Sequence, residues 1–266
     1  MTTTTAPVPS TEASTGASRP SARRRAAVAV AAFLACAIPV TFTMTITAML
    51  VTGTYADHRF HQLTGQGLVL TALWLGALLP LARAGWRGRR PSTAAGYRHL
   101  ALLGTGVAAC AVAPGGGAPV LLAVATVTGA ILWAALPLRP RLRGTVSVDP
   151  VLLPLALLVG AVLMPYAVDQ LALQNAATTG YHSHNPHLYD MAWVVTTIAV
   201  LALLGAVVRE ARGLLTWVAA GCTVIGAAGL VTGESAIWSG AVLSLGLVSF
   251  LAPRLARSRT AAEPTA

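Results

Sequence analysis

The 266-residue chain is 55% hydrophobic and only 10% charged, and its formal net charge is +10. Soluble domains average about 25% charged residues, so a single globular core does not suit this composition, whereas a lipid bilayer does. The positive charge comes entirely from arginines placed between apolar segments, a distribution that argues against a nucleic-acid-binding protein.

Eight apolar segments follow one another along the chain. Residues 1–25, rich in Thr, Ser, Pro and Ala, predict a disordered cytoplasmic tail. A helix needs about 20 apolar residues to cross the hydrocarbon core. On that basis we expect spans near 27–51, 63–83, 99–113, 118–137, 151–171, 188–208, 214–232 and 237–252. They form a first four-helix unit at 26–137, a basic cytoplasmic linker at 138–150, a second unit at 151–252 and a cytoplasmic tail at 253–266.

The arginines set the expected orientation. All except Arg59 precede the first span, follow the last, or lie between spans two and three, four and five, or six and seven. Basic residues gather on the cytoplasmic side of membrane proteins, so eight spans with both termini inside fit this pattern and seven do not. We therefore expect an all-α, multi-pass protein of the plasma membrane with the lipid bilayer as its surroundings.

One motif occurs twice. Tyr55-Ala56-Asp57-His58-Arg59-Phe60-His61 and the segment from Tyr181 to His187 both read Tyr-x-x-His-x-x-His, and the second begins 126 residues after the first. At the same offset, Pro39 falls on Pro165 within the preceding apolar segment. Four spans separate the motifs, so the recurrence predicts two parallel four-helix repeats.

The two motifs place five of the six histidines on the extracytoplasmic side: His58, His61, His182, His184 and His187. We expect Asp57 to cap span two, and Asn185-Pro186 to begin span six with Asn185 as its N-cap. If the halves pack about a pseudo-twofold axis along the membrane normal, the four matched histidines converge. His182, Asp57 and Asp190 then lie close behind them.

Four imidazoles with carboxylates behind them suit copper, zinc or the axial ligation of haem. Met44, Met49 and Met164 add thioethers suited to Cu(I). The leading hypothesis is therefore an outer-face metal or haem site for metal handling or membrane redox chemistry. The spacing leaves two other interpretations open: interfacial histidines that bond loop carbonyls and lipid headgroups, and a pH sensor.

The acidic residues support a second hypothesis. Asp57, Asp190 and Glu234 all fall at the expected outer face and could act as general acids in a cyclase-like enzyme on a lipophilic small molecule. Helix capping explains the same positions. A third hypothesis is a transporter or immunity-type membrane protein. The absence of lysine excludes a retinal Schiff base.

The plan of two four-helix halves with outer-face histidines is similar to that of haem A synthases, and His58-Arg59 resembles their His-Arg motif. Spans four and eight, at 118–137 and 237–252, contain no histidine and depart from that pattern. The eight-span plan is also similar to that of copper-resistance membrane proteins, with a resembling segment at Leu73-Trp74-Leu75-Gly76. These resemblances imply haem or copper as the bound group.

Overall fold

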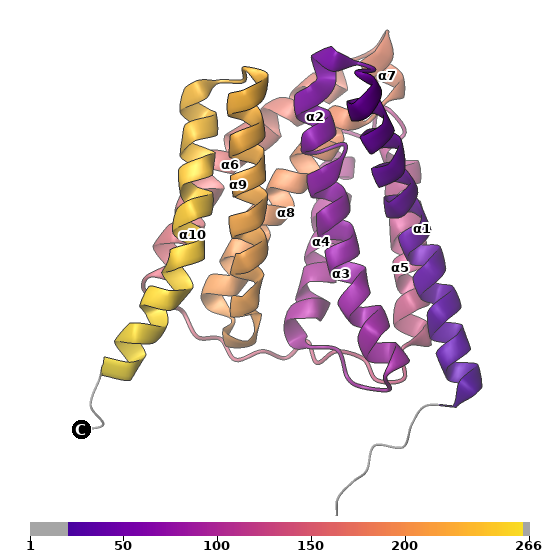
Figure 1. The fold of residues 1–266 in the computed structure, drawn as a ribbon, viewed down its shortest axis with the longest axis vertical. Coiled ribbons are helices and arrows are strands. Elements are labelled where there is room, and N and C mark those ends of the chain that lie inside the picture. Colours follow the sequence, from indigo (N-terminus) through magenta and orange to yellow (C-terminus); the bar gives the residue numbers. More distant parts are fainter. Residues whose placement is uncertain (1–20, 263–266) are drawn as a thin grey trace, which may run out of the picture.

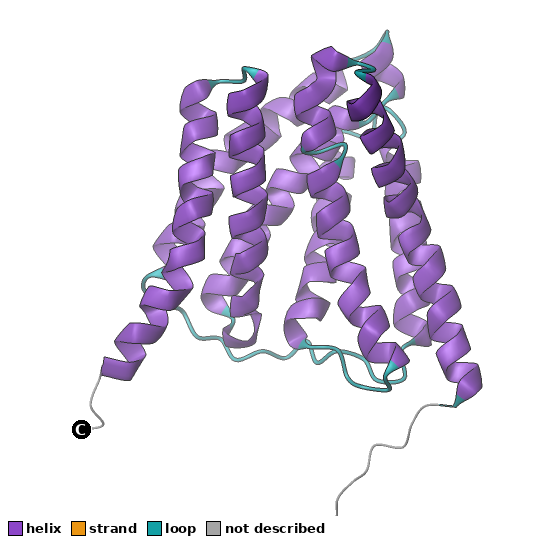
Figure 2. Ribbon diagram, in the orientation of Figure 1, coloured by secondary structure: helices purple, strands orange, loops and turns teal. Residues whose placement is uncertain are grey.

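The computed structural model describes residues 21–262, with side chains over residues 21–252. Within that range the protein is all-helical (Figures 1 and 2), and only an isolated bridge pairs Val146 with Val208. The long helices are α1 (Ala22–Thr52), α3 (Leu68–Trp86), α4 (Thr93–Val112), α5 (Ala118–Ala135), α6 (Leu152–Ala176), α8 (His187–Val207), α9 (Leu215–Thr232) and α10 (Ala236–Ala262). The short elements are η1 (Ala56–His58), α2 (Arg59–Leu63), α7 (Tyr181–His184) and η2 (Arg209–Leu214).

The long helices fall at the eight predicted apolar segments. Six helical segments are long and apolar enough to cross a membrane: Ala22–Thr52, Ala56–Trp86, Ala118–Ala135, Leu152–Ala176, His187–Val207 and Arg209–Thr232. A shorter apolar stretch covers Ala236–Ala252. Helix α4 is not among the six, and it carries the buried polar side chains of Arg98 and His99. The fold is that of a multi-pass, membrane-embedded helical protein.

Helices extend into both of the predicted cytoplasmic tails, 1–25 and 253–266. Most of the predicted tail at 1–25 lies outside the described residues, but Arg23, Arg24 and Arg25 belong to the first turn of α1. The Ser21 side chain caps that turn by accepting a hydrogen bond from Arg24 N–H at 3.4 Å. At the other end, helix α10 continues to Ala262, beyond the predicted end of its span at 252.

Each half of the chain packs in the same pattern (Figure 1). In the first half α1 packs on α3 and α5, and α4 packs on α3 and α5; in the second, α6 packs on α8 and α10, and α9 packs on α8 and α10. The halves meet where α4 contacts α8 and where α3 contacts α9 and α8. Pro39 and Pro165 both lie inside the first helix of their half.

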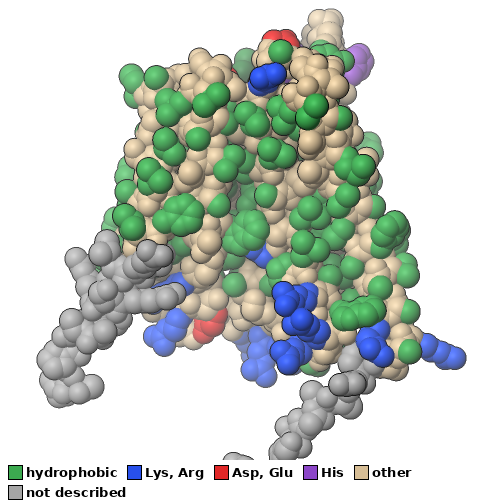
Figure 3. Space-filling model, in the orientation of Figure 1, with side chains coloured by type: hydrophobic (Ala, Val, Ile, Leu, Met, Phe, Trp, Pro, Cys, Tyr) green, Lys and Arg blue, Asp and Glu red, His purple; other side chains and the backbone are tan. Residues whose placement is uncertain are grey.

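Helix α8 is the centre of the bundle. Its residues from His187 to Val195 are all buried, and it contacts α4, α6, α9 and α3. The outward faces of the surrounding helices are apolar (Figure 3), as in α1, where Phe33 and Met44 are 73% and 69% exposed. Such continuous apolar surface on the flanks matches a lipid environment and not water.

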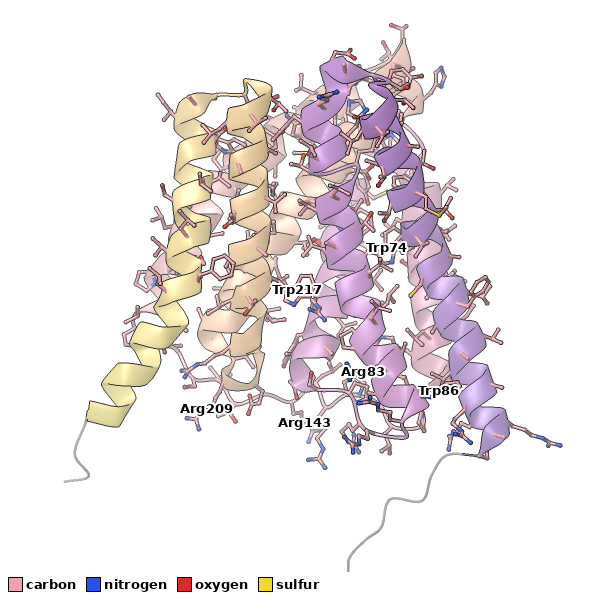
Figure 4. The ribbon with its side chains drawn as sticks, in the orientation of Figure 1. Trp74, Arg83, Trp86, Arg143, Arg209 and Trp217 are labelled. Carbon is pink, nitrogen blue, oxygen red and sulfur yellow. The ribbon has the colours of Figure 1, made fainter. Side chains whose placement is uncertain are left out.

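The two ends of the bundle differ in charge. Arginines gather at the end that carries the connections α3–α4, α5–α6 and α8–α9 (Figures 3 and 4); we call it the arginine end. There the linker 138–150 is held against the end of α8 and against η2: Ser147 N–H donates to Val207 O at 2.9 Å, and Asp149 pairs with Arg212 of η2 at 3.2 Å. The opposite end, which carries α2, α7 and the α9–α10 turn, is the histidine end.

Candidate metal centre

The first motif is folded by a sharp reversal after α1. Gly53 ends α1 in the left-handed region (φ 71°), and Tyr55 is the one non-glycine with positive φ (53°) among the described residues. This conformation is strained for a side chain, and such strain is found preferentially at functional sites. Gln62 Nε2 fixes the reversal by donating to the carbonyls of Thr54 and Tyr55, at 3.0 and 3.3 Å. The predicted cap by Asp57 is wrong, because neither η1 nor α2 has a side-chain cap.

The second motif is broken in the middle. Tyr181 to His184 form α7, and α8 begins at His187 after Asn185-Pro186. The prediction that Asn185-Pro186 begins this helix is close to the structure: Asn185 Oδ1 accepts from His187 N–H at 3.2 Å, but Pro186 is the residue before the helix and not its first residue. Gln174 Nε2 donates to His182 O at 2.9 Å and so ties α7 to α6.

The two motifs meet, and they do so through equivalent residues. Three pairs of residues that are 126 positions apart are in direct contact. They are Tyr55 with Tyr181 (5.5 Å between ring centroids), His61 with His187 (4.8 Å), and Gly65 with Met191, whose Sδ accepts from Gly65 N–H at 3.0 Å. The two halves of the chain therefore meet through residues at matching positions of the two motifs.

Three histidines form a group able to hold a metal ion. One ring nitrogen from each of His58, His61 and His187 lies within 4.8 Å of the other two. Nitrogens bound to one tetrahedral zinc ion at about 2.0–2.1 Å are roughly 3.4 Å apart, so closure on an ion requires side-chain movements of about an ångström. The fourth imidazole is that of His182, with ring centroids 4.5 Å from His187 and 5.6 Å from His58.

The imidazoles of this group lack hydrogen-bond partners. Both ring nitrogens of His187, Nδ1 of His61 and Nδ1 of His182 are buried and make no hydrogen bond to any described residue. A buried polar group without a partner costs roughly 1–3 kcal/mol, and native proteins seldom leave one. Several such nitrogens in one cluster of rings are therefore an arrangement that a bound cation would satisfy.

Two neighbours orient and cover His58. The carboxylate Oδ2 of Asp57 lies 3.5 Å from His58 Nε2, in the position of a carboxylate that fixes the orientation of a metal-binding imidazole. The ring of Tyr181 stacks on the His58 ring at 5.4 Å and also contacts His187. Asp57 itself is 77% exposed at its side chain, so its pairing with His58 occurs at the surface.

Asp190 is the most deeply buried acid of the described residues. It is 0% exposed, and neither carboxylate oxygen has a hydrogen-bond partner among them. It lies in the first turn of α8, three residues after His187, so both side chains project from one face of the helix. An ionised carboxylate in such a place is stable only beside a positive charge.

The remaining predicted residues lie outside this group. His184 is exposed at the end of α7, and no ring contact joins it to the other histidines. Glu234 is exposed in the α9–α10 turn, at the same end of the molecule. Met44 and Met164, on α1 and α6, are 69% and 38% exposed on the flanks.

Sequence reasoning missed the glutamines that hold the motifs in place. Gln62 and Gln174 are each 1% exposed, and Gln66 Nε2 joins the halves by donating to Asn185 Oδ1 at 3.0 Å. The sequence did contain an indication of their role, because an amide side chain inside an apolar segment has to find a hydrogen-bond partner when it is buried.

No protein-family model matches the chain, and neither the curated proteins nor the solved structures contain a match. The class of protein is therefore defined by the fold and the site alone. It is a multi-pass helical membrane protein with a histidine cluster, His58, His61 and His187, that could bind a metal ion.

Proposed function

We propose that this chain is a plasma-membrane protein of eight spans, built as two parallel four-helix repeats with both ends in the cytoplasm. The shared packing pattern of the halves and the three contacting pairs at the 126-residue offset support the repeat. The gathering of arginines at one end supports the orientation, because the positive-inside rule places that end in the cytoplasm (Figure 3). The histidine end then faces the outside of the cell.

We further propose that the histidine end binds a transition-metal ion through His58, His61 and His187, with His182 as a fourth ligand. The observation that carries this proposal is the convergence of ring nitrogens from His58, His61 and His187, of which both nitrogens of His187 are buried and unpaired among the described residues. Imidazole is a good ligand for both copper and zinc, and the ligand set alone does not separate the two ions. Asp57 would hold the His58 ring in orientation.

The packing favours a single ion over haem. The rings of His58, His61, His182 and His187 contact one another at 4.5–6.1 Å between centroids, so they leave no slot for a flat macrocycle between two axial ligands. A copper ion bound here would supply one-electron redox chemistry, and a zinc ion a Lewis acid. The role that follows is metal handling or membrane redox chemistry at the outer surface.

Asp190 gives the site its charge balance. Three or four neutral imidazoles bring no negative charge to a dication, whereas a buried carboxylate one helical turn from His187 does. The Asp190 carboxylate in turn needs the bound ion, since it has no other cationic partner among the described residues.

The test is metal analysis of the detergent-purified protein together with three single variants. Wild type is expected to retain close to one copper or zinc ion, and His61→Gln and His187→Gln to lose it. His184→Gln is the matched control, because His184 is an exposed histidine of the same motif outside the cluster. Metal-free wild-type protein that takes up neither ion on titration would refute the proposal, as would equal loss of metal in the His184→Gln control.

A second candidate function rests on the burial of Asp190. A membrane-embedded enzyme acting on a lipophilic small molecule needs an acid shielded from water, and Asp190 meets this requirement. Asp57 and Glu234, the other acids considered from sequence, are exposed. This candidate is favoured if Asp190→Asn abolishes turnover of a lipophilic substrate in protein that binds no metal.

A further inference from the structure

A pocket of about 300 Å³ opens at the histidine end between α1, the η1–α2 segment and the end of α9. It is lined by Leu50, Ala56, Arg59, Leu63, Val231 and Thr232. Its lining combines apolar side chains with one guanidinium group. The pocket lies beside the histidine cluster, because Arg59 directly follows the ligand His58, but it shares no lining residue with that cluster.

The charge of Arg59 is not neutralised by the protein. Over the described residues, the ion pairs within 4.0 Å are Asp57 with His58 and Asp149 with Arg212. Arg59 is exposed and pairs with no acid among the described residues. It also donates no side-chain hydrogen bond to a described residue, although a guanidinium carries five N–H donors.

The position of this arginine is also unusual. It is the one arginine of the chain that departs from the distribution expected of cytoplasmic loops. The wall that α9 contributes faces lipid, since Val231 is 84% exposed. Apolar walls open to the bilayer, with a cation at their outer end, match an amphiphile whose headgroup is negative and whose tail is apolar.

We propose that this pocket binds an anionic phospholipid of the outer leaflet, with its phosphate on Arg59 and its acyl chain along Leu63 and Val231. Phosphate fits because the planar guanidinium fork can donate two parallel hydrogen bonds to its oxygens. The site places a lipid phosphate next to His58, at the edge of the histidine cluster. The inference is separate from metal binding and holds for the metal-free protein as well.

The test is photolabelling in nanodiscs in the presence of a metal chelator. The probe is a phosphatidylglycerol with a diazirine in its acyl chain, and the matched probe is a phosphatidylcholine with the same chains. Labelled sites are mapped by mass spectrometry. In wild type, phosphatidylglycerol is expected to label the segments around Leu50–Leu63 and Val231 more strongly than phosphatidylcholine does.

The variants separate the pocket from general attraction to the arginines. Arg59→Gln is expected to lower labelling of the pocket about tenfold, as the loss of a charged hydrogen bond implies, while labelling at the arginine end stays unchanged. Arg143→Gln, which removes an exposed arginine at the other end, should leave pocket labelling intact. Ala56→Phe keeps the charge but fills the pocket, and should also reduce labelling.

Three results would overturn the inference. They are equal labelling by the two lipids, unchanged labelling in both Arg59→Gln and Ala56→Phe, and displacement of the lipid by an equal concentration of inorganic phosphate. The last would identify the occupant as a free anion. Metal content is measured on the same preparations before chelation, so a failure of the lipid site is distinguished from a failure of the metal site.

Discussion

The two copies of the Tyr-x-x-His-x-x-His motif share their Tyr and both His at the same spacing, but they fold differently. In the first copy His58 and His61 lie on the continuous η1–α2 segment, and both join the metal-binding group. In the second, the Asn185-Pro186 break separates α7 from α8, so that His187 joins the group and His184 is exposed. His182, two residues earlier, occupies the place beside His58 instead.

In the proposed repeat, this difference separates positions that contact their own counterparts from positions that do not. His61 and His187, which are 126 positions apart, contact each other and are therefore constrained by both halves. Other matched positions have different side chains and surroundings in each half. Position 190 shows this, because a buried acid stands there while its equivalent, Thr64, bonds to Met191 Sδ at 3.0 Å.

The largest expected effect comes from opening the contact between Gly65 and Met191. A Cβ added at Gly65 would lie 2.6 Å from the Met191 backbone Cα, so the halves would have to separate. We expect Gly65→Ala to destabilise the protein by about 3 kcal/mol, the upper range for overpacking. Thermal unfolding in detergent measures this.

Gly104→Ala makes the same substitution at a lipid-facing position of α4 where nothing lies within 4 Å. Its effect is expected to be small, within about 0.5 kcal/mol. Equal unfolding temperatures for the two variants would show that the copies do not meet closely at Gly65 and Met191.

A smaller effect is expected at His182. The sequence motif makes His184 the equivalent of His58, whereas the structure places His182 beside His58 and His187. We expect His182→Gln to weaken metal binding about 10–100-fold, the range for groups that support a metal site. Competition titration against a chelator of known affinity measures it. If His184→Gln weakened binding more than His182→Gln, the sequence alignment of the motifs would describe the site better than the fold does.

The sequence predicted the helices well because their signal is local. Apolar segments bounded by Gly-rich or Arg-rich connections mark each long helix, and the arginines at one end of the bundle follow from the same pattern. Helix α4 was harder to assign, since its first turns carry Arg98 and His99, which are buried through tertiary packing, with Arg98 4.3 Å from the ring centroid of Trp217. No pattern within α4 contains that partner.

The site was predicted only in part, because some of its features follow from local sequence and others from tertiary packing. Spacing alone brought out His58, His61 and His187, which the structure places together. His182 and not His184 lies in the cluster because of the break between α7 and α8 at Asn185-Pro186 and the hydrogen bond from Gln174 to His182 O. Both are properties of the folded loop. The burial of Asp190, beside the exposure of Asp57 and Glu234, depends on the packing of the other helices around α8.

The smallest expected effect tests the asymmetry at Asp190. Asp190→Asn keeps the size of the side chain and replaces by a neutral amide a buried carboxyl group that has no cationic partner among the described residues of the metal-free protein. The metal-free variant should therefore unfold at a higher temperature than metal-free wild type, with a gain of about 1 kcal/mol. The metal-bound variant should instead bind its ion about tenfold more weakly, because the compensating carboxylate is gone.

This variant is informative because its stability in the metal-free state is expected to rise while its affinity for the metal falls. A residue that only fills space would change both states alike, whereas a counter-charge stabilises the bound state at the expense of the free one. Thr64→Val is the matched control at the equivalent position of the first half, where the side chain is buried but uncharged. It should lower stability slightly, through the lost hydrogen bonding of the Thr64 hydroxyl to Phe60 O and Met191 Sδ, and leave the metal affinity unchanged. Equal metal affinities for Asp190→Asn and wild type would remove Asp190 from the site and leave the charge of the ion to be balanced from outside the bundle.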